Sequence, residues 1–157
     1  MASRHRHDFA LRTVWTGAAK GPTSGPDSYS RDYEVHSQGK PAIAASTGPA
    51  YGGDPARPNP EDLLLGALSG CHLLSYLALA ARAGVLVTAY EDDATCVLDM
   101  KDGRVRIVEA TLRPTVTIAA GGDVEKAKKL HERAHEICFI SNSVNFPVAI
   151  EPRMVVR

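Results

Sequence analysis

The feature that most constrains this chain is its longest apolar stretch, which runs from Leu63 to Val87 and is rich in alanine and glycine. Directly before it, Asn59 can cap a helix, Pro60 suits the first helical position, and two acids fall in the first turn. Gly84 provides a natural end. The sequence therefore predicts one long helix over about residues 60–83. Interrupting polar side chains indicate that it is a buried helix and not a membrane span.

This helix is apolar on most of its circumference, which indicates that protein surrounds it, either in a domain centre or between subunits. A chain of 157 residues is long enough for one domain with a core. Its 44% hydrophobic and 23% charged residues are typical of a globular protein. We expect a single domain over residues 1–157. The basic cluster near the start precedes no apolar run, so residues 1–8 are predicted to form a flexible tail and not a secretion signal.

Alternation of apolar and polar residues predicts six strands. They are Phe9–Trp15, Tyr29–Ser37, Pro41–Ser46, Val85–Met100, Arg104–Ile118 and Val148–Val156. Asp102-Gly103 predicts a hairpin turn between the fourth and fifth strands. Asp123 caps a second predicted helix that ends near Ile137. The order βββ-α-ββ-α-β describes an α+β fold around a long buried central helix.

Charge and cysteine content narrow the function classes. The formal net charge is zero, which favours neither nucleic acid nor an anionic membrane as a partner. The three cysteines are Cys71, Cys96 and Cys138. An odd count without a secretion signal argues against a secreted disulfide framework. We therefore expect a cytoplasmic protein in which any disulfide is transient and chemical.

A cysteine of this chain can be catalytic only if its surroundings favour the thiolate. A buried cysteine is more often a small core residue than a catalyst, and we assign Cys96 to the core. A thiol in apolar surroundings has a raised pKa and is inert. A catalytic Cys71 therefore needs a nearby cation, best an arginine, and an arginine in an apolar pocket needs a carboxylate in turn. The spacing of residues does not identify the members of this Cys–Arg–Glu set.

Two segments resemble the signatures of the OsmC/Ohr family of thiol peroxidases. The first, Asn59–Cys71 (NPEDLLLGALSGC), has Asn-Pro-Glu, then a small and apolar helix, then a cysteine ten residues after the glutamate. The second is Ala134–Ser143 (AHEICFISNS). The predicted order of strands and helices agrees as well, so the resemblance covers nearly the whole chain.

The resemblance implies a role for each site residue. Cys71 is the implied peroxidatic cysteine, Cys138 the resolving one, and Glu61 the carboxylate that holds an arginine over Cys71. Arg31, in Ser30-Arg31-Asp32, is the closest match to the arginine of the organic hydroperoxide resistance branch. Arg57 occupies the corresponding place for the OsmC branch. We favour Arg31, because a strand holds a side chain better than a proline-flanked loop does. Phe139 departs from the proline that often follows the second cysteine.

The resemblance also implies an activity and an assembly. The expected protein is an antioxidant enzyme that reduces organic hydroperoxides to alcohols through a Cys71–Cys138 disulfide, without a cofactor. An external dithiol, such as a lipoyl group, would reduce that disulfide. Glu61 and Cys71 lie about 15 Å apart along a straight helix, so either the helix breaks or a second subunit helps to complete the site. We expect the intertwined homodimer known for the family.

Three alternatives remain open at this level. A chain of this fold could serve as a thiol redox sensor or small-ligand binder without efficient turnover. His131, His135 and Cys138 fall at i, i+4 and i+7 and have the composition of a zinc site, with Cys71 as a fourth ligand. A cysteine hydrolase would pair Cys71 with a histidine. His72 is excluded as its base, because adjacent helical residues point in different directions, and no oxyanion-hole motif is visible.

Overall fold

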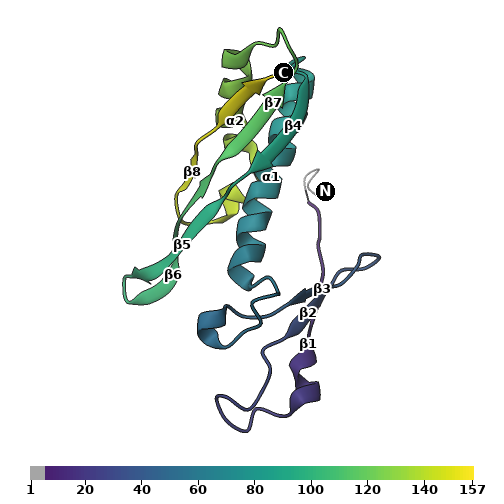
Figure 1. Cartoon of the computed structure of the whole chain (residues 1–157), viewed down its shortest axis with the longest axis vertical. Coiled ribbons are helices and arrows are strands. Elements are labelled where there is room, and N and C mark those ends of the chain that lie inside the picture. The colour runs from purple at the N-terminus through teal and green to yellow at the C-terminus, as the bar shows by residue number, and fades with distance from the viewer. Residues whose placement is uncertain (1–5) are drawn as a thin grey trace. The chain divides into compact units, whose positions relative to one another are not determined.

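The computed structural model describes residues 6–157 (Figure 1). The chain forms two compact units, Met1–Leu63 and Leu64–Arg157, which are considered separately below. Residues 1–5 of the predicted tail lie outside the described part of the chain, and residues 6–8 are exposed. The expectation of a single domain over residues 1–157 stays a prediction.

The first unit contains a three-stranded antiparallel sheet in the order β1-β2-β3. Its strands are β1 (Arg12–Trp15), β2 (Tyr33–His36) and β3 (Ile43–Ala45), with the short 3₁₀ helices η1 (Thr16–Lys20) and η2 (Pro49–Tyr51). The three strands are shorter than the sequence predicts. Arg31 was expected on the second strand, and this is wrong. The Asp32 carbonyl oxygen accepts hydrogen bonds from the backbone N–H groups of Thr16 and Gly17, so the chain joins the sheet only after Asp32.

The long helix α1 spans Pro60–Arg82, as predicted. At its start the Asn59 side chain accepts from the Asp62 N–H (2.8 Å), and the Asp62 carboxylate accepts from the Asn59 N–H (3.0 Å). This reciprocal capping satisfies two otherwise unpaired donors. At its end Gly84 adopts φ 71°, and the Val85 N–H donates to the Ala80 carbonyl (2.9 Å). That arrangement is a Schellman motif, for which glycine is the favoured residue.

Within the single chain, α1 buries one stripe and not its whole circumference. Leu68, His72, Tyr76 and Ala80 recur every four residues and are buried. On another face Leu74 is 69% exposed. By length and composition the helix also passes the criterion for a membrane span, with a mean hydropathy of 1.7, which corrects the expectation that it is too polar. Core helices of globular proteins pass the same test.

The second unit contains two three-stranded sheets in the orders β4-β7-β9 and β5-β6-β8. In each sheet an antiparallel pair gains a third, parallel strand. Three predicted strands are each divided in two, because the chain passes from one sheet to the other at residues 93–94, 113 and 151–152. The strands are β4 (Val87–Asp92), β5 (Thr95–Lys101), β6 (Arg104–Leu112), β7 (Pro114–Ile118), β8 (Val148–Ile150) and β9 (Arg153–Val156).

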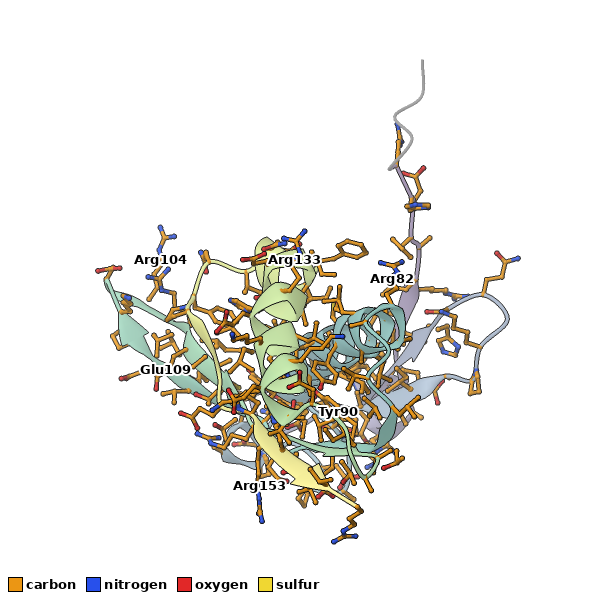
Figure 2. The ribbon with its side chains drawn as sticks, turned by 90° about the horizontal axis from the view of Figure 1, so that it is seen from above. Arg82, Tyr90, Arg104, Glu109, Arg133 and Arg153 are labelled. Atoms are coloured by element: carbon orange, nitrogen blue, oxygen red, sulfur yellow. The ribbon has the colours of Figure 1, made fainter. Side chains whose placement is uncertain are left out.

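The second helix, α2 (Val124–Ile137), follows the predicted cap, where the Asp123 side chain accepts from the Lys126 N–H (2.9 Å). Both helices lie on one face of the strands (Figure 2). A core cluster joins α1, α2 and the β4-β7-β9 sheet, and it includes Tyr76, Ala80, Val116, Ile118, Ala127 and Ala134. Burial of this apolar face is the main stabilising contribution to the unit.

Candidate functional site

The site begins with two cysteines that the second unit brings together. Cys71 lies in the middle of α1, half-buried, and Cys138 is the C-cap residue of α2. The Cys71 side chain lies beside the Cys138 thiol, close enough to contribute to the shift of the Cys138 pKa. Both residues are thiols in this structure. Two sulfurs in contact, contributed by two different helices, are the minimum needed for a disulfide that forms and breaks during a reaction.

The Cys138 thiol is held in its protonated form by its surroundings. Its side chain is 1% exposed, and burial raises its pKa to about 11, to which the neighbouring Cys71 thiol also contributes. The backbone N–H groups of Ser141 and Ile140 act in the opposite direction, and the Ser141 N–H lies 3.5 Å from the sulfur. Since the thiolate is the reactive form, Cys138 suits a second step better than the first attack on a substrate.

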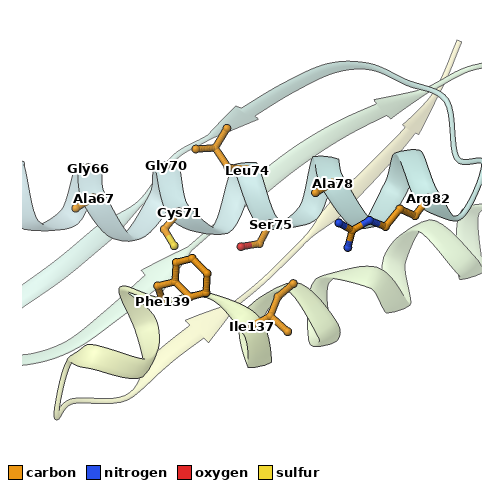
Figure 3. Close-up of a pocket in the computed structure, with 10 residues that line it drawn as sticks. All are labelled: Gly66, Ala67, Gly70, Cys71, Leu74, Ser75, Ala78, Arg82, Ile137 and Phe139. Carbon is orange, nitrogen blue, oxygen red and sulfur yellow. The ribbon is translucent and has the colours of Figure 1, made fainter. Parts of the chain in front are cut away.

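A cavity of about 660 Å³ opens beside Cys71 between α1 and the residues that end α2 (Figure 3). Its lining is small or apolar, apart from the Cys71 thiol, the Ser75 hydroxyl and the Arg82 guanidinium. Phe139 lies at the Cys71 end, and its side chain is 81% exposed. The remaining lining residues are Gly66, Ala67, Gly70, Leu74, Ala78 and Ile137. Such a lining favours the apolar part of an organic molecule.

Two polar members of this pocket, Ser75 and Arg82, were missed by the sequence analysis. A signal for them existed, because Ser75, Ala78 and Arg82 follow Cys71 at i+4, i+7 and i+11 and so share one face of the helix. The family pattern places the activating cation before α1, whereas Arg82 lies on the same helix as the cysteine.

The two arginines favoured from sequence both belong to the first unit. The Arg31 guanidinium stacks over the Tyr29 ring, 4.8 Å from its centroid, and donates to the Pro26 carbonyl oxygen (2.7 Å). Arg57 pairs with Asp54 at 3.3 Å. Each arginine is thus held by neighbours within its own unit. Cys71 belongs to the other unit.

Glu61 lies half-buried in the first turn of α1. Among the residues that the structure describes, no ion pair joins it to Arg31 or Arg57. The helix is continuous from Pro60 to Arg82, so Glu61 and Cys71 stand about 15 Å apart along it. The option of a broken helix between them is therefore excluded.

The comparison with known proteins now decides the family. A family model for OsmC-like protein matches residues 52–153, which include both cysteines and Glu61. The chain belongs to the OsmC-like protein family. Membership of this family supports a peroxiredoxin-like role in general.

Solved structures agree with this membership. An OsmC-like protein of unknown function from Vibrio cholerae is 30% identical, with a TM-score of 0.86, over 94% of this chain and 99% of that one. The organic hydroperoxide resistance protein OsmC from Legionella pneumophila is 15% identical, with a TM-score of 0.68, over 95% and 97% of the two chains. This second likeness shows a shared fold. The α+β fold predicted from sequence is confirmed.

The curated relative is the uncharacterized protein YmaD of Bacillus subtilis (strain 168). It is 26% identical over 96 residues, which are 59% of this chain. The aligned part spans 64% of the length of that relative.

The zinc site considered from sequence does not form in this OsmC-like chain. His131 Nδ1 lies 3.0 Å from His72 Nε2, His135 Nδ1 lies 3.2 Å from the Ser141 hydroxyl, and the Cys138 thiol contacts Cys71. Helical spacing brings these side chains near one helix face, but packing gives each a different partner. Over residues 6–157 no group of three His, Cys, Asp or Glu side chains is arranged to hold a metal ion.

The third cysteine has the structural role that the sequence suggests. Cys96 on β5 is half-buried and packs against the second core cluster, formed by Leu68, Ala110 and Leu112. His72 is buried and pairs with His131, which agrees with its exclusion as a base for Cys71.

Proposed function

We propose that this protein is a thiol-dependent peroxidase that reduces organic hydroperoxides to alcohols through Cys71 and Cys138. The observation that carries the proposal is the contact between these two thiols at one end of an apolar cavity. A half-buried cysteine that faces the cavity can meet a substrate. A fully buried partner, held as a thiol, can react once the first sulfur has been oxidised.

In the first step the Cys71 thiolate attacks the distal oxygen of the hydroperoxide. A sulfur–oxygen bond forms as the oxygen–oxygen bond breaks, and the alkoxide leaves as the alcohol after taking up a proton. Cys71 is then a sulfenic acid. The apolar cavity favours organic hydroperoxides over hydrogen peroxide, because it can bury their hydrocarbon part.

In the second step the Cys138 sulfur attacks the Cys71 sulfenic acid, and water leaves as the disulfide forms. An external dithiol then reduces this disulfide by thiol–disulfide exchange and is itself oxidised to a disulfide. Lipoyl groups are the dithiols that the family resemblance suggests. We place this cycle in the cytoplasm, where reductants keep resting thiols reduced.

Activation of Cys71 requires a cation, and we assign this role to Arg31 with Glu61 as its partner, and with Arg57 as the alternative. The continuous α1 supports an arrangement that uses two subunits, since Glu61 and Cys71 of one helix are too far apart for one side chain to bridge. The exposed apolar face of α1, which includes Leu74 and Leu77, supports a homodimer. Light scattering at micromolar concentration should report twice the chain mass, whereas an active monomer would contradict the homodimer.

The function is tested by steady-state turnover of tert-butyl hydroperoxide with dihydrolipoamide. Comparison of Arg31→Ala with Arg57→Ala should identify the activating arginine by the larger loss of kcat/KM. Thiol counting after one equivalent of cumene hydroperoxide should show the loss of two thiols per chain. A wild-type protein that keeps all its thiols would overturn the peroxidase assignment.

A redox sensor is the second candidate function, favoured by Phe139 in place of the usual proline after Cys138. The same two experiments separate it from the enzyme. A sensor loses two thiols to one equivalent of hydroperoxide but turns over slowly with every dithiol offered.

A further inference from the structure

The turn after α2 contains a hydrogen-bonded pair of side chains to which the proposed reaction assigns no role. His135 lies in the last turn of α2, and its Nδ1 atom lies 3.2 Å from the hydroxyl of Ser141. The backbone N–H of the same serine donates to the Cys138 sulfur (3.5 Å). Ser141 therefore connects an imidazole to the sulfur of the proposed resolving cysteine.

The position of Cys138 disfavours a thiolate in two ways. Cys138 is the C-cap residue of α2, and the carbonyl end of a helix carries the negative pole of its dipole. The side chain is also buried, and burial raises the pKa of the thiol to about 11. The backbone N–H groups of Ser141 and Ile140 act in the opposite direction. The direction of these two N–H groups therefore affects how readily the sulfur becomes negative.

Two steps of the proposed cycle place negative charge on this sulfur. In closure, Cys138 loses its proton to water and attacks the Cys71 sulfenic acid, whose sulfur–oxygen bond breaks, and hydroxide leaves as water after taking up a proton. In opening, an external thiolate attacks the more accessible Cys71 sulfur, the sulfur–sulfur bond breaks, and Cys138 leaves as a thiolate that takes up a proton. The second thiol of the external dithiol then displaces Cys71. A donor on the Cys138 sulfur stabilises the charge that both steps require.

The Ser141 N–H keeps its direction only while the turn after Cys138 keeps its shape. Ser141 opens the short 3₁₀ helix η3 (Ser141–Ser143), and its hydroxyl is joined to α2 through His135. Phe139, the residue after Cys138, is 81% exposed and leaves free a backbone angle that a proline would fix. The hydrogen bond between His135 and Ser141 therefore restrains a turn that lacks this other restraint.

We propose that His135 is a positioning residue for Cys138, whose hydrogen bond to Ser141 holds the Ser141 N–H on the sulfur and so speeds both closure and opening of the Cys71–Cys138 disulfide. This role rests on the proposed peroxidase function and concerns its later steps. The first attack on the hydroperoxide should not depend on the pair, because neither His135 nor Ser141 lines the cavity that Cys71 faces.

The test of closure counts thiols and dimedone-trapped sulfenic acid over time after one equivalent of cumene hydroperoxide. In His135→Leu and in Ser141→Ala the sulfenic acid should form at the wild-type rate, whereas its conversion to the disulfide should slow by roughly tenfold, the effect of weakening a hydrogen bond to a charged group. His135→Asn should recover most of the rate, because its amide can bond the Ser141 hydroxyl. The matched control Ser143→Ala removes a hydrogen bond of the same turn, from the Ser143 hydroxyl to the Phe139 carbonyl oxygen (2.7 Å), and should behave as wild type.

The test of opening uses the disulfide formed with diamide, an oxidant that does not require the peroxidase reaction. Reduction by dithiothreitol should be roughly tenfold slower in Ser141→Ala than in wild type, again the effect of weakening a hydrogen bond to a charged group. Unchanged closure and opening in both His135→Leu and Ser141→Ala, or equal slowing in Ser143→Ala, would overturn the positioning role and leave the peroxidase intact. Failure of the peroxidase proposal would instead appear as wild-type protein that keeps its thiols in cumene hydroperoxide, although its diamide-formed disulfide still opens faster than that of Ser141→Ala.

Discussion

Two pairs of side chains connect α1 to the chain of α2, and they begin at neighbouring residues of α1. Cys71 faces the cavity and meets Cys138, whereas His72 faces the core and meets His131 at 3.0 Å. The imidazole pair is buried and the Tyr76 ring stacks on His131 at 4.1 Å. One step along a helix turns a side chain by about 100°, which is enough to separate a reactive contact from a structural one.

Burial shifts the pKa of Cys138 and the pKa of the two imidazoles in opposite directions, for the same physical reason. It raises the pKa of the Cys138 thiol to about 11 and lowers the pKa of His72 and of His131 to about 4, because a low-dielectric surrounding disfavours each charged form. Cys138 and both imidazoles are therefore neutral near pH 7. The thiol pair can react after Cys71 is oxidised. The imidazole pair contributes to the stability of the fold only while both rings stay uncharged.

The strongest test of the comparison is Cys71→Ser. Turnover of tert-butyl hydroperoxide should fall to the uncatalysed level, because a serine hydroxyl is not a nucleophile toward peroxide at neutral pH. The matched variant Cys96→Ser should keep most of the activity, since Cys96 packs against the second core cluster and lines no part of the cavity. Peroxidase activity that survives in Cys71→Ser would show that Cys71 is not the residue that attacks the peroxide.

The next largest effect should come from Cys138→Ser. The first equivalent of hydroperoxide should still oxidise Cys71, but the sulfenic acid should persist, because no second sulfur is present to condense with it. Dimedone labelling followed by mass spectrometry should detect this species on Cys71. Steady-state turnover with dihydrolipoamide should decrease by roughly tenfold or more, equivalent to about 1.4 kcal/mol. An undiminished rate with no trapped sulfenic acid would contradict the resolving role.

Acid should destabilise the protein through the imidazole pair. The pKa of a histidine is near 6.5 in the unfolded chain and about 4 for His72 and His131 in the folded one. Between these values the unfolded state binds more protons, so the free energy of unfolding decreases as pH falls from about 6.5 toward 4. The loss should be on the order of 2 kcal/mol per histidine by pH 5.

Urea denaturation at several pH values measures this loss. The variant His36→Gln, which changes a histidine of the β1-β2-β3 sheet, should keep the loss between pH 6.5 and 4, because His72 and His131 remain in place. A free energy of unfolding that stays flat between pH 7 and pH 5 would show that the pair is not held neutral by burial.

The smallest effect should follow Tyr76→Phe. The hydroxyl of Tyr76 donates to the Ala127 carbonyl oxygen (3.1 Å), so its removal leaves one buried acceptor unpaired and keeps the ring on His131. A decrease of about 1 kcal/mol in the free energy of unfolding is expected, with the peroxidase rate unchanged. If the rate fell without a change in stability, the structural and reactive pairs would not be separate.

The local parts of the fold were predictable because neighbours in the chain determine them. Asn59 and Asp62 cap α1 reciprocally and Gly84 ends it, as the sequence indicates. The Asp102-Gly103 turn has positive φ at both residues, as a tight hairpin requires. By contrast, Val85–Met100 reads as one strand but forms β4 and β5 in different sheets. Alternation reports which face a residue takes and carries no information on the sheet to which a strand belongs.

The sequence by itself determined the long capped helix, the second helix that ends at Cys138, and the motif spacing that marks Cys71 and Glu61. Only the tertiary structure decided that the two thiols lie side by side, that His131 pairs with His72, and that Arg82 shares the cavity of Cys71. The physical reason is the distance along the chain between the residues that interact. Caps, turns and helical faces depend on hydrogen bonds between near neighbours, whereas each of these site contacts depends on how α1 and α2 pack over the sheets.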